Sequence, residues 1–133
     1  MLAAVFAPYA QMFTIAVQTS VVISEERVFK TDFVLLRHRA EAGAAELPGA
    51  ADVLLLVESI TPTSMTDRHV KLPINAAAGI PEYWIVDFND KLLEVFRDPI
   101  GDEYAFRRTF TGDMAISSLA CPEVSLCVGS LFT

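Results

Sequence analysis

The chain has 133 residues, of which 53% are hydrophobic and 20% charged, a balance typical of one globular domain and not of a disordered chain. Its formal net charge of −7 repels nucleic acid at long range, so a function on DNA or RNA needs a local basic patch, a metal ion or a partner. The two cysteines, Cys121 and Cys127, are too few for a disulfide framework and lack CxxC spacing, so we expect inert thiols and a cytoplasmic protein.

The first segment, "MLAAVFAPYAQMFTIAV", is apolar but does not have the pattern of a signal peptide or a membrane span. It lacks a basic start, Pro8 and Gln11 interrupt it, and no apolar run reaches the 18 or so residues that a span needs. We therefore expect neither export nor membrane insertion. Because Pro8 breaks helices, any helix within residues 1–13 is expected to be short.

Three strands are predicted in the first half of the chain. Residues 13–23 are rich in β-branched side chains and partly alternate, and residues 32–37 form a second short strand. Residues 52–59, "DVLLLVES", are a continuous apolar run, which is typical of a strand that is covered on both faces. We expect this last segment to be the central strand of the sheet.

One helix is predicted between the strands of the two halves. Thr66 or Asp67 can cap its start, it runs to about Ala78, and Gly79 ends it. Pro73 lies inside that span and predicts either a kink or a true helix start near Leu72.

Three further strands follow, in "EYWIVDF", "KLLEVFR" and "EYAFRRTF". Turns are predicted at residues 89–90 and 99–102. A helix between strands, with a meander after it, indicates an α/β or α+β fold, with one domain over residues 1–133 built on a mixed β-sheet with flanking helices.

Three charged residues stand at the ends of apolar segments: Asp32 opens one strand, Glu58 closes another, and Lys71 lies on the helix that follows. A carboxylate at the end of a buried strand is costly to desolvate unless it is paired or binds a metal. Two carboxylates from adjacent strands would suit a hard cation such as Mg²⁺, and a nearby lysine could orient water or offset charge on a phosphate. The spacing alone leaves open the alternative of solvated strand ends and an ordinary surface lysine.

The other candidate residues are better explained without a catalytic role. His38 and His69 have no partner at ligand spacing and are expected at the surface. Tyr83 and Trp84, in an apolar strand, are expected in the core, with base stacking as the weaker alternative. Neither GxxxxGK[ST] nor GxGxxG occurs, so the sequence does not predict a nucleotide-binding fold.

Five segments carry a resemblance to a known family: "TDFVLLR", "DVLLLVESITPTS", "DRHVKLPINAAAGIPEYWIVD", "KLLEVFRDPIGDEY" and "PEVSLCVGSLF". From Asp32 onward the chain resembles the Uma-type family of putative restriction endonucleases, a branch of the PD-(D/E)XK nuclease superfamily. The run "AAGIPEYWIVD" is the most specific part of the match. Thr31 stands where the family has a proline before its first acid, and Asn75 stands where a tyrosine is common.

The resemblance implies a restriction-endonuclease-like fold and a catalytic triad. By that resemblance Asp32 and Glu58 are the metal ligands and Lys71 is the third catalytic residue, with Mg²⁺ or Mn²⁺ as cofactor and DNA as substrate. Family members usually begin with an additional segment that carries a further glutamate, so the chain is expected to be N-terminally short.

Three hypotheses of function follow. The first is a Mg²⁺-dependent endonuclease that hydrolyses DNA phosphodiester bonds, and the second is a catalytically inactive nuclease-fold domain that serves in dimerisation or partner binding. The third, nucleic-acid binding without cleavage, is weaker because no basic run with interleaved aromatic residues is evident. A homodimer is expected because the mean hydropathy of +0.41 is high for a chain with one small core, and because related nucleases often pair to cut two strands.

Overall fold

The computed structural model of the protein describes residues 2–9, 12–24, 27–37, 47–60 and 65–132, with only the backbone described at residue 3 and at residues 65–69. The elements are α1 (Leu2–Phe6), a 3₁₀ turn (Ala7–Tyr9), β1 (Phe13–Ser24), β2 (Arg27–Arg37), a 3₁₀ turn (Ala50–Asp52), β3 (Val53–Ile60), α2 (Met65–Ala77), β4 (Glu82–Asp87), β5 (Leu92–Ile100), β6 (Glu103–Thr111), β7 (Ala115–Ser118), β8 (Cys121–Cys127) and a 3₁₀ helix (Val128–Phe132).

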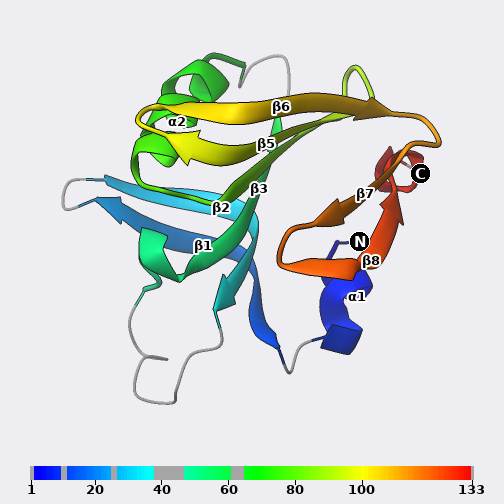
Figure 1. Ribbon diagram of the computed structural model, residues 1–133, viewed down its shortest axis with the longest axis horizontal. Helices are drawn as coiled ribbons and strands as arrows, with labels where there is room; N and C mark the ends of the chain where they lie inside the picture. Colours follow the sequence, from blue (N-terminus) through cyan, green and yellow to red (C-terminus); the bar gives the residue numbers. More distant parts are fainter. Residues whose placement is uncertain (1, 10–11, 25–26, 38–46, 61–64, 133) are drawn as a thin grey trace.

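The main sheet has six strands that follow one another in chain order, β1-β2-β3-β4-β5-β6. All neighbours are antiparallel except β3 and β4, which run parallel. A parallel pair needs a crossover connection, and α2 provides it. The expected mixed sheet with a helix between strands is therefore confirmed, and Figure 1 shows α2 on one side of the sheet and the separate β7–β8 ribbon on the other.

β3 is an internal strand, as its continuous apolar sequence predicts. It lies between β2 and β4, and Leu55 and Leu56, whose side chains point to opposite faces, are both fully buried. A charged side chain in the middle of this strand would have no route to water on either face.

Two apolar clusters pack against the two faces of the sheet. The cluster beneath α2 contains Tyr83, Ile85 and Leu56, and Leu72 and Ile74 of the helix pack against it. The cluster on the other face contains Trp84, and residues of α1, β7, β8 and the C-terminal 3₁₀ helix cover it. Tyr83 and Trp84 are both 0% exposed, so the prediction that they belong to the core is confirmed.

Of the two alternatives that Pro73 raised for α2, the later helix start is not observed. The helix starts at Met65 and continues through Pro73 to Ala77, so a helix start near Leu72 is wrong. Its predicted end is confirmed, because Gly79 has φ 78°, a left-handed conformation that glycine adopts without steric cost at a helix C-terminus.

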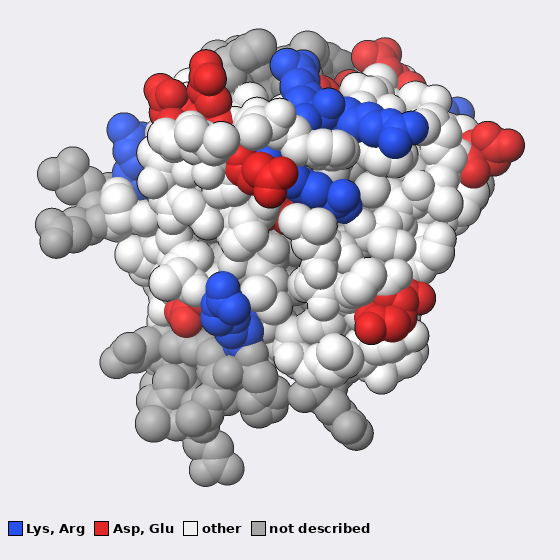
Figure 2. Space-filling model, viewed as in Figure 1, with Lys and Arg blue, Asp and Glu red and all other residues white. Residues whose placement is uncertain are grey.

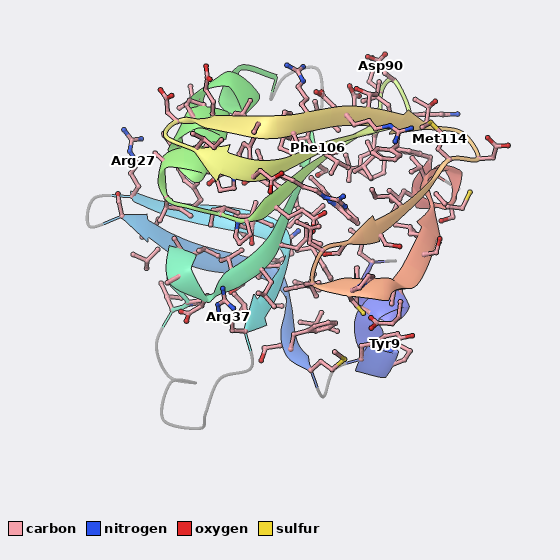
Figure 3. All side chains as sticks on the ribbon, in the orientation of Figure 1. Tyr9, Arg27, Arg37, Asp90, Phe106 and Met114 are labelled. Atoms are coloured by element: carbon pink, nitrogen blue, oxygen red, sulfur yellow. The ribbon has the colours of Figure 1, made fainter. Side chains whose placement is uncertain are left out.

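Of the two turns predicted in the meander, the first lies where the sequence predicts it and the second is shorter than predicted. At residues 89–90 the side chain of Asp87 accepts hydrogen bonds from the backbone N–H groups of Asn89 and Asp90, each at 3.0 Å, which is an Asx-type turn. In the second case β5 continues through Pro99, which pairs with Tyr104, so the turn is shorter than residues 99–102. Asp90 marks the β4–β5 turn in Figure 3, and Arg27 lies at the tip of the β1–β2 hairpin.

Both cysteines are free thiols, Cys121 buried and Cys127 exposed. Burial raises the pKa of the Cys121 thiol, which keeps it protonated and weakly nucleophilic. In the part of the chain that the structure describes, no helix is long and apolar enough to cross a membrane. The predictions for His38 and for the side chain of His69 lie outside the described residues.

Candidate functional site

The site is organised by the pairing of β2 with β3. The register pairs Phe33 with Val57, and the next step along the two strands places Asp32 directly across from Glu58. Lys71 comes from α2, which follows β3 in the chain. Three residues far apart in the sequence are thus brought to one end of the β2–β3 pair.

Glu58 is a buried carboxylate, 7% exposed, with two hydrogen-bond donors. The ammonium of Lys71 lies 3.2 Å from Oε1, and the hydroxyl of Tyr83 donates to Oε2 at 3.1 Å. Burial raises the pKa of Glu58 above its ordinary value of 4.5, the neighbouring Lys71 and Tyr83 oppose that rise, and the charge of Asp32 adds to it. The pKa is raised on balance because these two donors do not fully replace the water that the ionised carboxylate loses.

Asp32 is held at its place by neighbouring polar groups. Its Oδ2 accepts hydrogen bonds from the backbone N–H of Ser59 at 2.7 Å and from the Ser59 hydroxyl at 2.9 Å. Its Oδ1 accepts a hydrogen bond from the side-chain amide of Gln18 at 3.1 Å. The carboxylate is half-buried and has a fixed orientation beside the end of β3.

Lys71 is not an ordinary surface lysine. Its side chain is 22% exposed and forms the ion pair with Glu58, and its ammonium also lies 5.1 Å from the ring centroid of Phe29 on β2. A cation over an aromatic face gains a further attraction when it is partly removed from water. The lysine is therefore fixed between α2 and the two strands that carry the acids.

A cavity of about 330 Å³ adjoins Asp32. It is lined by Asp32, Gln18 and Ser59 together with apolar side chains of α1, β1–β4, the turn after β4 and the C-terminal segment: Leu2, Val17, Phe33, Val57, Val86, Phe88 and Leu131. Cavities of this size accept small organic groups, with a few polar side chains fixing their orientation.

Asp32 and Glu58 are oxygen donors, the type of ligand that a hard divalent cation prefers. In the described ranges no group of three or more His, Cys, Asp or Glu side chains is placed to hold a metal ion. Mg²⁺, however, is usually bound through one or two carboxylates and keeps several waters. Asp32 and Glu58 supply two carboxylates at one end of the β2–β3 pair.

Sequence reasoning missed the residues that support the triad. Tyr83 was assigned to the core, and its ring does lie there, but its hydroxyl serves Glu58. The signal was available, since in a parallel β3–β4 pair an alternate strand residue such as Tyr83 can point to the same face as Glu58. Gln18 could not have been found, because its contact with Asp32 depends on the register of the β1–β2 hairpin.

Comparison with known proteins gives a family and a fold. Residues 1–129 match the family Uma2, described as "Putative restriction endonuclease". Among solved structures, the chain is similar to the crystal structure of a putative nuclease belonging to DUF820 from Anabaena variabilis ATCC 29413, with a TM-score of 0.77 and 16% sequence identity over 98% of this chain and 73% of that chain. No curated protein matches the chain.

The chain belongs to the Uma2 family, since the match covers nearly its whole length. The solved neighbour, at 16% identity, shows the fold alone, and that fold is nuclease-like. The family and the fold together suggest a nuclease, which is the class of protein that the resemblance predicts.

Proposed function

We propose that the protein is a metal-dependent endonuclease that hydrolyses DNA phosphodiester bonds, with Asp32 and Glu58 holding Mg²⁺ or Mn²⁺ and Lys71 acting beside them. The observation that carries the proposal is the buried Glu58–Lys71 pair at the same end of β2–β3 as Asp32. Enzymes place buried, closely paired charges in this way where a reaction develops charge.

Each residue has a distinct task in the proposed reaction. A cation bound by the two carboxylates would neutralise phosphate charge and favour ionisation of an attacking water. Water adds its oxygen to the phosphorus, one P–O ester bond breaks, and the leaving oxygen takes up a proton to become a hydroxyl. Lys71 stabilises negative charge on the phosphate through its ammonium, Tyr83 orients Glu58, and Ser59 orients Asp32.

The electrostatics of the whole molecule make this local arrangement necessary. The chain carries a net charge of −7, and on the face shown in Figure 2 basic and acidic side chains are interspersed. Long-range attraction of DNA is therefore weak, and the bound cation and Lys71 would supply the positive charge where the phosphate approaches.

A second candidate, an inactive nuclease-fold domain used in dimerisation or partner binding, is favoured by one feature of the same site. The oxygens of both carboxylates already accept hydrogen bonds, Glu58 from Lys71 and Tyr83, and Asp32 from Ser59 and Gln18. Each acid already has donors from the protein itself, and a cation would have to displace some of them.

Plasmid cleavage and calorimetry separate the two candidates. Wild type, Lys71→Ala and Glu58→Ala are incubated with plasmid at low salt in Mg²⁺, Mn²⁺ or EDTA, and binding of each cation is titrated by calorimetry. For a nuclease, Lys71→Ala still binds the cation and loses about 10²–10³ in cleavage rate, and Glu58→Ala loses both binding and cleavage. Nicking that persists in Glu58→Ala indicates a contaminant, and neither binding nor nicking in any sample favours the inactive domain.

We also propose that the protein acts as a homodimer. Large apolar side chains are exposed on β2, on β1 and just before it, with Val28, Val17 and Met12 all more than half exposed, and their burial against a second copy of the chain would be favourable. Light scattering at micromolar concentration should give twice the chain mass of 14.6 kDa. A monomer at that concentration contradicts the proposal.

A further inference from the structure

Asn75 is a buried polar residue whose side chain has no hydrogen-bond partner in the part of the chain that the structure describes. Its side chain is 0% exposed, and neither Oδ1 nor Nδ2 has a hydrogen-bond partner among the described residues. A buried amide in that state is costly, and native structures contain few of them, so each calls for an explanation.

The position of Asn75 on α2 connects it to the candidate site. It stands four residues after Lys71, and residues four apart on a helix are neighbours on one face. Helical side chains also lean toward the N-terminus, so the Asn75 amide leans toward the turn that carries Lys71. In the structure Lys71 donates to Glu58 instead, which leaves the amide without a donor.

We infer that Asn75 is a positioning residue. Its side-chain oxygen accepts a hydrogen bond from the Lys71 ammonium when Glu58 no longer does. In its catalytic part the inference rests on the proposed function: with a cation held by Glu58, Asn75 would accept the Lys71 ammonium and keep it close to the phosphate. The orphaned amide is the cost of keeping this second acceptor ready.

A double-mutant cycle on stability tests the contact without any need for cleavage. In wild type, Asn75→Leu removes the orphaned amide and should raise the midpoint of thermal unfolding by about 2–6 °C. In a Glu58→Ala background Lys71 is released, Asn75 becomes its acceptor, and the same substitution should give no gain or a loss. In a Glu58→Ala, Lys71→Ala background the gain should return.

Two further variants keep the test decisive. Asn75→Ala repeats the cycle in case leucine overfills the site, and Glu58→Met replaces Glu58→Ala if the alanine variant does not fold. Asn75→Asp should raise the unfolding midpoint in the Glu58→Ala background, because it returns a carboxylate to Lys71, and should lower it in wild type. An equal gain from Asn75→Leu in all three backgrounds overturns the inference.

Cleavage then separates this inference from the proposed function. If the protein is a nuclease, Asn75→Leu should melt at a higher temperature than wild type and yet cleave about 10- to 100-fold more slowly. Unchanged cleavage by this more stable variant overturns the positioning role. If wild type does not cleave at all, the proposed function fails, while the stability cycle still decides whether Asn75 and Lys71 make contact.

Discussion

Two buried glutamates on neighbouring strands are held in opposite ways. Glu82, at the start of β4, is 0% exposed and is surrounded by donors: Oε2 accepts from the Trp84 indole at 2.9 Å and from Arg97 at 2.8 Å, and Oε1 accepts from the Ser118 hydroxyl at 2.7 Å and from the Leu119 backbone at 2.9 Å. Glu58, on β3, has one donor for each oxygen.

The difference separates a structural acid from a candidate functional one. Every donor to Glu82 belongs to the main sheet or to the β7–β8 ribbon, so the carboxylate joins the two sheets and has no free position for a ligand. Glu58 is only partly supported, has a raised pKa, and lies directly across from a second acid. Burial alone therefore does not distinguish a functional carboxylate from a structural one. In this pair, the better guide is how many hydrogen-bond donors the protein supplies to each carboxylate.

Glu82→Ala should have the largest effect on stability. It leaves the Arg97 side chain, 17% exposed, without its carboxylate and releases the β7–β8 ribbon, so the free energy of unfolding should fall by about 3–5 kcal/mol. Urea denaturation measures the loss, with Glu58→Ala as the matched variant. Glu82→Gln, which keeps the shape, should fall between wild type and Glu82→Ala. The comparison breaks if Glu58→Ala is the more destabilising of the two alanine variants.

Glu58→Gln should change how stability depends on pH. Because the folded-state pKa of Glu58 lies above 4.5, the folded protein binds this proton more tightly than the unfolded chain does. Its contribution to stability is therefore present below about pH 4.5 and is lost as the pH rises through the folded-state pKa. The stability of Glu58→Gln relative to wild type should then increase between pH 4 and pH 8, measured by thermal unfolding.

A companion variant sharpens the same test. Lys71→Met removes the ammonium that opposes the rise in the Glu58 pKa, so it should make the loss of stability with pH steeper than in wild type. A difference between Glu58→Gln and wild type that stays constant or falls across this range contradicts the assignment of Glu58 as a poorly supported carboxylate.

Arg107→Ala should have the smallest effect of the series. Arg107 pairs with the buried Glu94 at 3.1 Å, but its own side chain is 61% exposed, so solvent already screens the pair. We expect a loss of about 0.5 kcal/mol, several-fold less than for Arg97→Ala, whose guanidinium reaches Glu82. Equal losses in the two arginine variants would mean that exposure does not rank these pairs.

The segments that form the six strands of the main sheet, and the internal place of β3, could be predicted because local patterns indicate them. β3 has an apolar run that only a doubly covered strand can hide, Gly79 ends α2, and the turn at Asn89 and Asp90 is held by the side chain of Asp87, close by in the chain. Pro73 was harder, because a proline inside a helix is costly but packing of α2 on the sheet overrides that local preference.

Local sequence patterns could not predict the β7–β8 ribbon or the residues that hold the acids of the candidate site in place. Ser118 and Glu82 are 36 residues apart, and nothing in "AISS" or "CPEVSLC" reports that a carboxylate on another strand holds the ribbon. Asp32, Glu58 and Lys71 were selected by resemblance and remain a prediction as catalytic residues. Their proximity depends on strand register, which hairpin geometry and core packing fix together.

The agreement between strand order and chain order has a consequence for folding. Antiparallel neighbours such as β5 and β6 can join as hairpins within microseconds, whereas the β3–β4 pair must wait until the chain through α2 has closed a long loop. Glu58 and Tyr83 lie on those two strands, so we expect the candidate site to be assembled last. Pulsed hydrogen exchange during refolding should protect the amides of β5 and β6 before those shared by β3 and β4, and the reverse order would contradict this sequence of events.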